Sequence, residues 1–243
     1  MRLRNIMVAL ALVAGASFHP ADAQQLKSRV DSLNYSFGMV QSQGLMRFLD
    51  QFRQEVFGND STNTEGLNVE LFMQGFNDGM VHKTDVMTVE TANRVLPELI
   101  NIVKAETTLR QYGYNKEAGE KFLAENAKKK GVKVLPSGVQ YKILTKGTGP
   151  VPADTCRVKV HYEGHTIDGK EFDSSYKRGK PAEFGCKQVI KGWTEALTHM
   201  PVGSVWEVYI PQELAYGEHK QGNDILPFSM LIFKIELLEI VNK

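Results

Sequence analysis

The fold of the C-terminal half is decided by the stretch Arg157-Val158-Lys159-Val160-His161-Tyr162. Apolar side chains alternate in it with charged or polar ones, a period of two that is typical of a strand with one buried face. The same alternation returns in residues 206–210 and 231–237, and between these strands only residues 188–198 favour a helix. We therefore predict an α+β domain over residues 131–243, with an antiparallel sheet and one short helix.

Upstream of this domain the apolar period is that of a helix. In residues 26–57 the spacings of three and four place one set of side chains on a single stripe: Leu26, Val30, Leu33, Phe37, Val40, Gly44, Phe48 and Phe52. A second stripe follows a turn-rich break at residues 58–63, with Asn68 as its N-cap: Leu67, Leu71, Phe72, Phe76 and Met80. Two such helices cannot cover both stripes with each other. We expect residues 24–87 to form an all-α dimerisation domain that pairs with a second copy of the chain.

Residues 88–130 are expected to form a long linker helix, which would reach ~60 Å if it were continuous at 1.5 Å per residue. Pro97 lacks a backbone donor and should kink or restart the helix, and Gly113 is a second weak point, so one bent rod and two helices both remain open. Asn115 could cap a fresh helix after such a break. Gly131 is well placed to end the helix after the lysines at 128–130, which favour the negative end of its dipole.

The first residues resemble a cleaved export signal. Arg2 and Arg4 precede an apolar run over residues 6–16, and Ala21-Asp22-Ala23 is a small-residue cleavage site. The run is well under the ~20 apolar residues needed to span a bilayer, and no later stretch comes near. We predict that residues 1–23 are a signal peptide and that the mature chain starts at Gln24, as a soluble periplasmic or secreted protein.

Composition and motifs exclude several classes of function. The 243 residues are 42% hydrophobic and carry a net charge of +1. This net charge is too small to attract nucleic acid or a membrane surface by long-range electrostatics. There is no Gly-x-Ser-x-Gly elbow and no nucleotide loop, and His161 and His165 lack a helical metal-binding context. The sequence predicts no metal and no cofactor. Cys156 and Cys186 permit a disulfide worth roughly 3–4 kcal/mol, or are two small buried side chains; their spacing favours neither.

Five runs occur in order at a family's spacing: Val160-His161-Tyr162-Glu163-Gly164, Gly169-Lys170-Glu171-Phe172-Asp173-Ser174-Ser175, Gln188-Val189-Ile190-Lys191-Gly192-Trp193, Leu214-Ala215-Tyr216-Gly217 and Leu231-Ile232-Phe233-Lys234-Ile235-Glu236-Leu237. Residues 131–243 with these runs resemble an FKBP-type peptidyl-prolyl cis/trans isomerase domain. The lead-in at 118–126 and 135–141 is similar to the macrophage infectivity potentiator class of that family. The resemblance implies a sheet wrapped around one short helix, and dimers paired through N-terminal helices. It also implies that the strand of Cys156 runs beside the segment of Cys186, which favours the disulfide.

The resemblance assigns a role to each pocket residue. Trp193 is expected to form the floor under a proline ring, with Tyr162, Phe172 and Phe233 as walls. The rest of the implied set comprises the rim residue Val189, the backbone donor Ile190, the hydroxyl donor Tyr216, the acceptor Asp173 and the loop residue Ile225. Smaller members of the family often carry an aromatic residue at the position of Ala182, and Phe184 is the candidate to fill that wall here. A dry apolar pocket of this kind disfavours the planar, dipolar amide more than the twisted transition state, so it needs neither a nucleophile nor a metal.

The expected function is isomerisation of X-Pro bonds in unfolded or exported polypeptides. An alternative is a dimeric chaperone or client-binding module with little turnover, for which methionines of the N-terminal helices would supply adaptable apolar surface: Met39, Met46, Met73, Met80 and Met87. The same methionines fit the core of a dimer. Isomerisation of a short X-Pro peptide separates the two functions.

Overall fold

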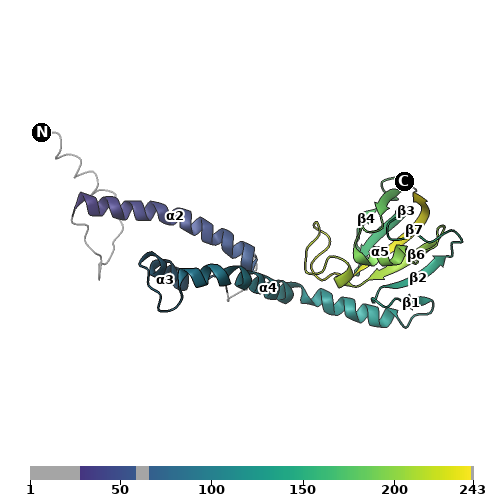
Figure 1. Ribbon diagram of the computed structural model, residues 1–243, viewed down its shortest axis with the longest axis horizontal. Helices are drawn as coiled ribbons and strands as arrows, with labels where there is room; N and C mark the ends of the chain where they lie inside the picture. The colour runs from purple at the N-terminus through teal and green to yellow at the C-terminus, as the bar shows by residue number, and fades with distance from the viewer. Residues whose placement is uncertain (1–27, 59–65, 242–243) are drawn as a thin grey trace. The chain divides into compact units, whose positions relative to one another are not determined.

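The computed structural model describes residues 28–58 and 66–241 (Figure 1). The predicted signal peptide, residues 1–23, and Leu26 of the first stripe lie outside the described residues. The chain divides into two compact units, Met1–Glu55 and Val56–Lys243. Along the described chain, helices precede an antiparallel sheet, which confirms the predicted fold class.

Helices α2 (Arg29–Phe57) and α3 (Val69–Met80) match the two predicted apolar stripes. The side chain of Asn68 caps α3, since its Oδ1 accepts a hydrogen bond of 2.9 Å from the Leu71 N–H. No residue of α3 is buried. Much of both stripes is exposed to solvent: Val30, Leu33, Phe37, Val40, Phe48, Leu71, Phe76 and Met80.

Helix α4 (Val89–Asn126) begins at its N-cap Thr88, whose Oγ1 accepts a hydrogen bond from the Thr91 N–H, and runs without a break through Pro97 and Gly113. It ends short of the predicted Lys130, because residues after Asn126 turn back toward the sheet. Asn115 lies inside the helix and caps nothing. Residues Val89–Asn126 therefore form one continuous helix with Pro97 inside it.

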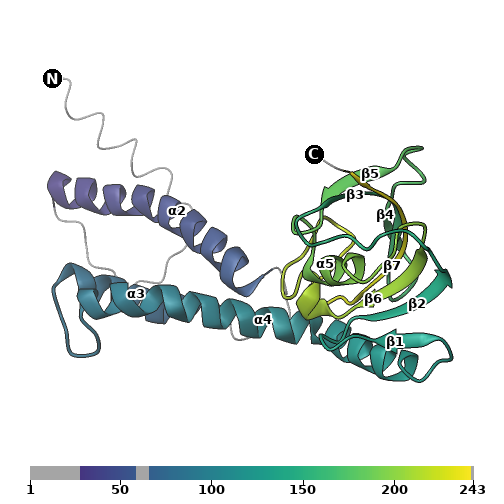
Figure 2. The ribbon, with the colours of Figure 1, turned by 45° about the vertical axis from the view of Figure 1, so that its right-hand side comes forward.

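Seven strands form one antiparallel sheet: β1 (Val132–Val134), β2 (Gln140–Thr145), β3 (Arg157–Thr166), β4 (Glu171–Ser174), β5 (Ala182–Gly185), β6 (Val205–Ile210) and β7 (Leu231–Val241). Their order is β1-β2-β6-β7-β3-β4, and β5 pairs with the other part of β3. Helix α5 (Lys191–Leu197) lies across one face of the sheet, as Figures 1 and 2 show. It is shorter than the predicted 188–198, because Ile190 is already its extended N-cap.

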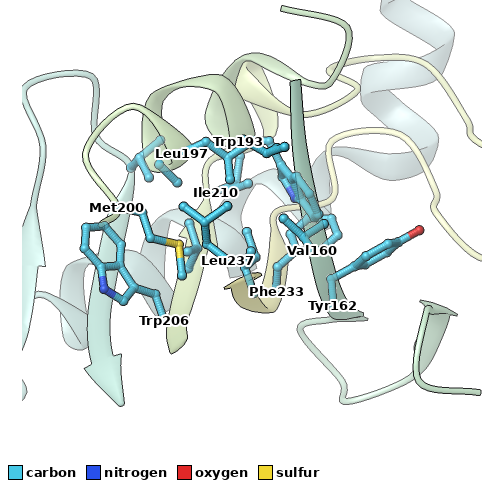
Figure 3. Close-up of a cluster of buried hydrophobic side chains, with 14 of the residues drawn as sticks. Val160, Tyr162, Trp193, Leu197, Met200, Trp206, Ile210, Phe233 and Leu237 are labelled. Atoms are coloured by element: carbon cyan, nitrogen blue, oxygen red, sulfur yellow. The ribbon is translucent and has the colours of Figure 1, made fainter. Parts of the chain in front are cut away.

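The core lies between α5 and the sheet. Alternate residues of β3 are buried along its whole length, so the period of two in the sequence corresponds to one covered face. Trp193 and Leu197 of α5 pack with Val160 and Ile210 in this cluster, whereas the Tyr162 ring extends to one end of it with its hydroxyl pointing outward (Figure 3). This end of the core opens into the candidate site.

Candidate active site

A cavity of about 450 Å³ opens beside α5, and ten side chains line it: Tyr162, Phe172, Asp173, Phe184, Gln188, Val189, Ile190, Trp193, Tyr216 and Phe233. Every residue that the sequence analysis assigned to the pocket is among them except Ile225. Ile225 is 4% exposed and packs in the core cluster, so it supports the loop from within and does not line the cavity. Gln188 is an addition that the sequence analysis missed; its only signal was its position beside Val189.

Aromatic rings of the cavity pack edge to face. Three of them contact the indole of Trp193, and a fourth contacts one of those three. The ring centroid of Trp193 lies 5.1 Å from Tyr162, 5.7 Å from Phe184 and 5.2 Å from Phe233, with interplanar angles between 84° and 89°. Phe172 meets Phe233 at 5.5 Å in the same way. Edge-to-face contacts are the preferred geometry of aromatic pairs and fix each ring against its neighbours. The aromatic part of the cavity lining is consequently one packed cluster, in which Trp193 contacts three of the other rings.

Gly164 of β3 makes room for two of these rings. A Cβ at this position would lie 2.6 Å from Cζ of Phe172 and 2.7 Å from Cε1 of Phe233. Gly164 is paired with Phe233 in the β3–β7 register. The absence of a side chain here lets both rings lie against the strand backbone, and the walls of the cavity depend on it.

A polar network borders the cavity at Tyr162. The Tyr162 hydroxyl donates to the Asp173 carboxylate, and the Arg178 guanidinium donates both to Asp173 and, at 2.8 Å, to the Tyr162 oxygen. The guanidinium also lies 5.4 Å from the Tyr162 ring centroid, in cation–π range. Arg178 was missed in the sequence, where Lys177 and Lys180 are also cations within a few positions of Asp173. Only the fold distinguishes the three cations.

The network sets the ionisation of its members. Burial, followed by the hydrogen bond to Asp173, raises the pKa of the Tyr162 phenol. For Asp173, burial acts to raise the pKa, but the hydrogen bonds from Tyr162 and Arg178 outweigh it, and the pKa lies below its ordinary value. At neutral pH the cavity edge therefore holds a protonated phenol, a carboxylate and a guanidinium.

Two further hydrogen-bond donors lie among the residues that line the cavity, the Tyr216 hydroxyl and the Ile190 N–H. Burial and the charge of Asp173 raise the pKa of the Tyr216 phenol, so its hydroxyl remains protonated. The carbonyl of Ile190 accepts from the N–H groups of Trp193 and Thr194, which starts α5. Among the described residues, no hydrogen bond uses the Ile190 N–H.

Comparison with known proteins places this geometry in a family. The profile "FKBP-type peptidyl-prolyl cis-trans isomerase" matches residues 149–238, and "Domain amino terminal to FKBP-type peptidyl-prolyl isomerase" matches residues 30–143. The "FKBP-type 22 kDa peptidyl-prolyl cis-trans isomerase" of Escherichia coli is 49% identical over 178 residues, which cover 73% of this chain and 85% of that protein. "Outer membrane protein MIP" of Legionella longbeachae is 37% identical over 244 residues, 99% of this chain and 98% of its own. The chain belongs to the FKBP-type peptidyl-prolyl cis-trans isomerases.

Solved structures agree with this family. The isomerase from Pseudomonas syringae superposes with a TM-score of 0.51 at 41% identity over 54% of this chain and 96% of its own. FkpA from Escherichia coli superposes with a TM-score of 0.54 at 29% identity over 89% of this chain and 98% of its own. The likeness to the MIP protein over nearly the whole chain confirms the macrophage infectivity potentiator class. The chain is thus a peptidyl-prolyl cis-trans isomerase with the N-terminal domain of that class.

The two cysteines of this isomerase lie beside each other but are free thiols. The Cys186 N–H donates to the Cys156 carbonyl at 2.9 Å, continuing the ladder between β3 and β5. The structure does not contain the disulfide that the family resemblance favoured. Burial, followed by the charges of Cys156 and Asp154, raises the pKa of the buried Cys186 thiol.

Neither a metal centre nor a membrane span is found in the described part of the chain. Within residues 28–58 and 66–241, no three His, Cys, Asp or Glu side chains gather as metal ligands would. None of the helices described there is long and apolar enough to cross a bilayer.

Proposed function

We propose that the cavity binds the proline ring of an exported polypeptide and lowers the barrier to rotation about the preceding peptide bond. The observation that carries this proposal is the edge-to-face aromatic hollow around Trp193. An X-Pro bond prefers trans by only ~0.5–1 kcal/mol but crosses a barrier of ~18–20 kcal/mol, because resonance holds the amide planar. The twisted transition state has lost that resonance and is less dipolar, so an apolar pocket stabilises it relative to the planar amide.

The aromatic and aliphatic lining residues form three parts of the proposed binding site. Trp193 forms the floor under the proline ring, and Tyr162, Phe172 and Phe233 form the walls. Phe184 and Val189 form the rim against the residue before proline. Because rotation breaks no covalent bond, the residues act by binding and orientation alone.

The polar groups act on the substrate carbonyls. The Ile190 N–H and the Tyr216 hydroxyl donate hydrogen bonds to them in the twisted geometry. Asp173 is an acceptor that is already engaged by Tyr162 and Arg178. It therefore orients the Tyr162 hydroxyl and keeps a negative charge at the edge of the cavity.

A pair of tryptophan substitutions tests the proposal. Trp193 and Trp206 are both buried, but Trp206 stacks on Tyr141 at 4.2 Å and lines no part of the cavity. We expect Trp193→Leu to lower kcat/KM on a short X-Pro peptide by about tenfold or more. Trp206→Leu should cost comparable stability and leave kcat/KM within about twofold, since a structural role does not discriminate the transition state. Equal losses in the two variants would remove Trp193 from the mechanism.

The N-terminal helices supply a second proposed property, homodimerisation. The apolar stripes of α2 and α3 are exposed in the single chain, including Phe37, Val40 and Phe76. Exposed apolar area of this extent is typical of a subunit interface. Sedimentation of the mature chain should give a dimer, and Phe37→Glu, which buries a charge in that interface, should give a monomer. A wild-type monomer at micromolar concentration would refute this assignment.

Variants of the N-terminal helices and of the cavity can distinguish the chaperone alternative from the isomerase. If client binding by the methionine-containing helices is the main activity, suppression of aggregation of an unfolded client should survive Trp193→Leu and be lost in Phe37→Glu. If isomerisation is the main activity, short-peptide turnover should show the opposite pattern. We propose the isomerase as the main activity, in the periplasm or outside the cell after removal of residues 1–23. Mass spectrometry of the exported protein should find Gln24 at its N-terminus.

A further inference from the structure

The connection between β6 and β7, residues 211–230, carries Tyr216 to the cavity and is closed by its own hydrogen bonds. The Gly217 N–H donates to the Gln212 carbonyl at 2.9 Å, and the Phe228 N–H donates to the Gly217 carbonyl at 2.7 Å. Tyr216 is therefore tied, through the next peptide unit, to the far end of the loop. Phe228 adopts a φ of 61°, in a left-handed region that residues with a Cβ occupy only when their surroundings impose it.

Helix α4 supplies those surroundings. The Asn115 side chain donates from Nδ2 to the Pro227 carbonyl at 3.0 Å. One turn further, Gly119 is buried so closely that a Cβ there would lie 3.2 Å from both Cβ and Cγ of Met230. Asn115 and Gly119 are four positions apart and so share one helix face. Their contacts bracket Phe228 on both sides in the sequence.

The end of α4 is fixed to the sheet independently of the loop. The buried Asn126 donates to Oε1 of Gln140 at 3.0 Å, and Gln140 donates back to the Leu123 carbonyl at 2.8 Å. The Phe122 ring lies 5.9 Å from the ring of Tyr209 on β6. Figure 2 shows this part of α4 running alongside β1. The helix is thus a rigid support against which the loop is held.

We propose that Asn115 and Gly119 of the linker helix are positioning residues of the isomerase site. They hold the segment Pro227–Met230, and the bond from Phe228 to Gly217 transmits that hold to the Tyr216 hydroxyl. The last turns of the linker helix then belong functionally to the catalytic domain. The inference rests on the proposed role of Tyr216, and the experiment below separates failure of one from failure of the other.

The first test is Asn115→Leu in the full mature chain. Leucine has nearly the shape of asparagine, lacks the donor and favours the helix, so the fold is retained. Loss of one hydrogen bond that orients a catalytic group is expected to lower kcat/KM on an X-Pro peptide about fivefold. The matched control is Glu117→Leu, which places the same side chain at an exposed position of the same helix. It should leave kcat/KM unchanged.

A cycle with Tyr216→Phe distinguishes positioning from general support. If Asn115 acts through Tyr216, Asn115→Leu has no further effect on kcat/KM in the Tyr216→Phe background. The inference would be overturned if the double variant lost kcat/KM by the product of the two single losses, or if Asn115→Leu alone lost none. Gly119→Ala is the second variant. It is expected to lower kcat/KM, because its methyl group pushes Met230. In the Tyr216→Phe background it should lower kcat/KM no further.

Hydrogen exchange gives a readout that does not depend on activity. The Phe228 amide should exchange faster in Asn115→Leu than in the wild type, while the midpoint of thermal unfolding is unchanged. An unaltered exchange rate of the Phe228 amide would refute the claim that Asn115 holds this loop. If Tyr216→Phe alone keeps full activity, the proposed role of Tyr216 fails, and accelerated exchange at Phe228 still establishes that Asn115 holds the loop.

Discussion

Replacing Gly164 by alanine perturbs two walls of the cavity with one methyl group. The new Cβ would lie 2.6 Å from Phe172 and 2.7 Å from Phe233, so each ring has to retreat by roughly 1 Å to reach an ordinary carbon–carbon contact. Neither ring can retreat alone, because the two pack edge to face and Phe233 also packs on Trp193. Overpacking of this kind costs about 1–3 kcal/mol of the free energy of unfolding.

The effect on catalysis should exceed the effect on stability. Displacing catalytic walls by about 1 Å can cost on the order of a hundredfold in rate, so we expect kcat/KM of Gly164→Ala to fall between about ten- and a hundredfold. The assays are isomerisation of a short X-Pro peptide and denaturant unfolding of the same sample. Phe172→Leu in the Gly164→Ala background removes the ring atoms that the methyl group meets, and should recover part of the lost stability. Wild-type kcat/KM in Gly164→Ala would refute the account of these walls.

Three further outcomes follow from the charges, thiols and caps. Since the pKa of Asp173 is below its ordinary value of 3.8, its ionisation stabilises the fold above about pH 4, and this stabilisation is lost as the pH falls through the lowered pKa. Unfolding free energies measured from pH 5 to pH 2 should therefore fall less steeply in Asp173→Asn; an identical slope would contradict the shift. Iodoacetamide should alkylate the half-buried Cys156 before the buried Cys186, whose pKa is raised, and peptide mass spectrometry of a time course would show the reverse order if this is wrong. Asn68→Ala removes the cap of α3 and should cost about 1 kcal/mol, measured by denaturant unfolding; an unchanged midpoint would mean that the cap contributes nothing.

The sequence by itself determined the elements and most of the cavity. A period of two marked β3 and a period near 3.6 marked α2, because each pattern reports only which face of a segment is buried. The motif runs then identified the family, and with it every lining residue except Gln188. These inferences use only the order of residues along the chain, either as a local period or as a match to a family's motifs.

Only the tertiary structure decided how distant segments meet. It set the pairing of Gly164 with Phe233, chose Arg178 over two nearby lysines, buried Ile225 in the core, and turned Asn115 from an expected cap into a support for the loop at Pro227. The physical reason is common to all four. Each depends on which atoms from different segments of the chain come within a few ångströms of one another. The apolar period of a segment is the same whichever neighbour it packs against, so it does not predict these contacts.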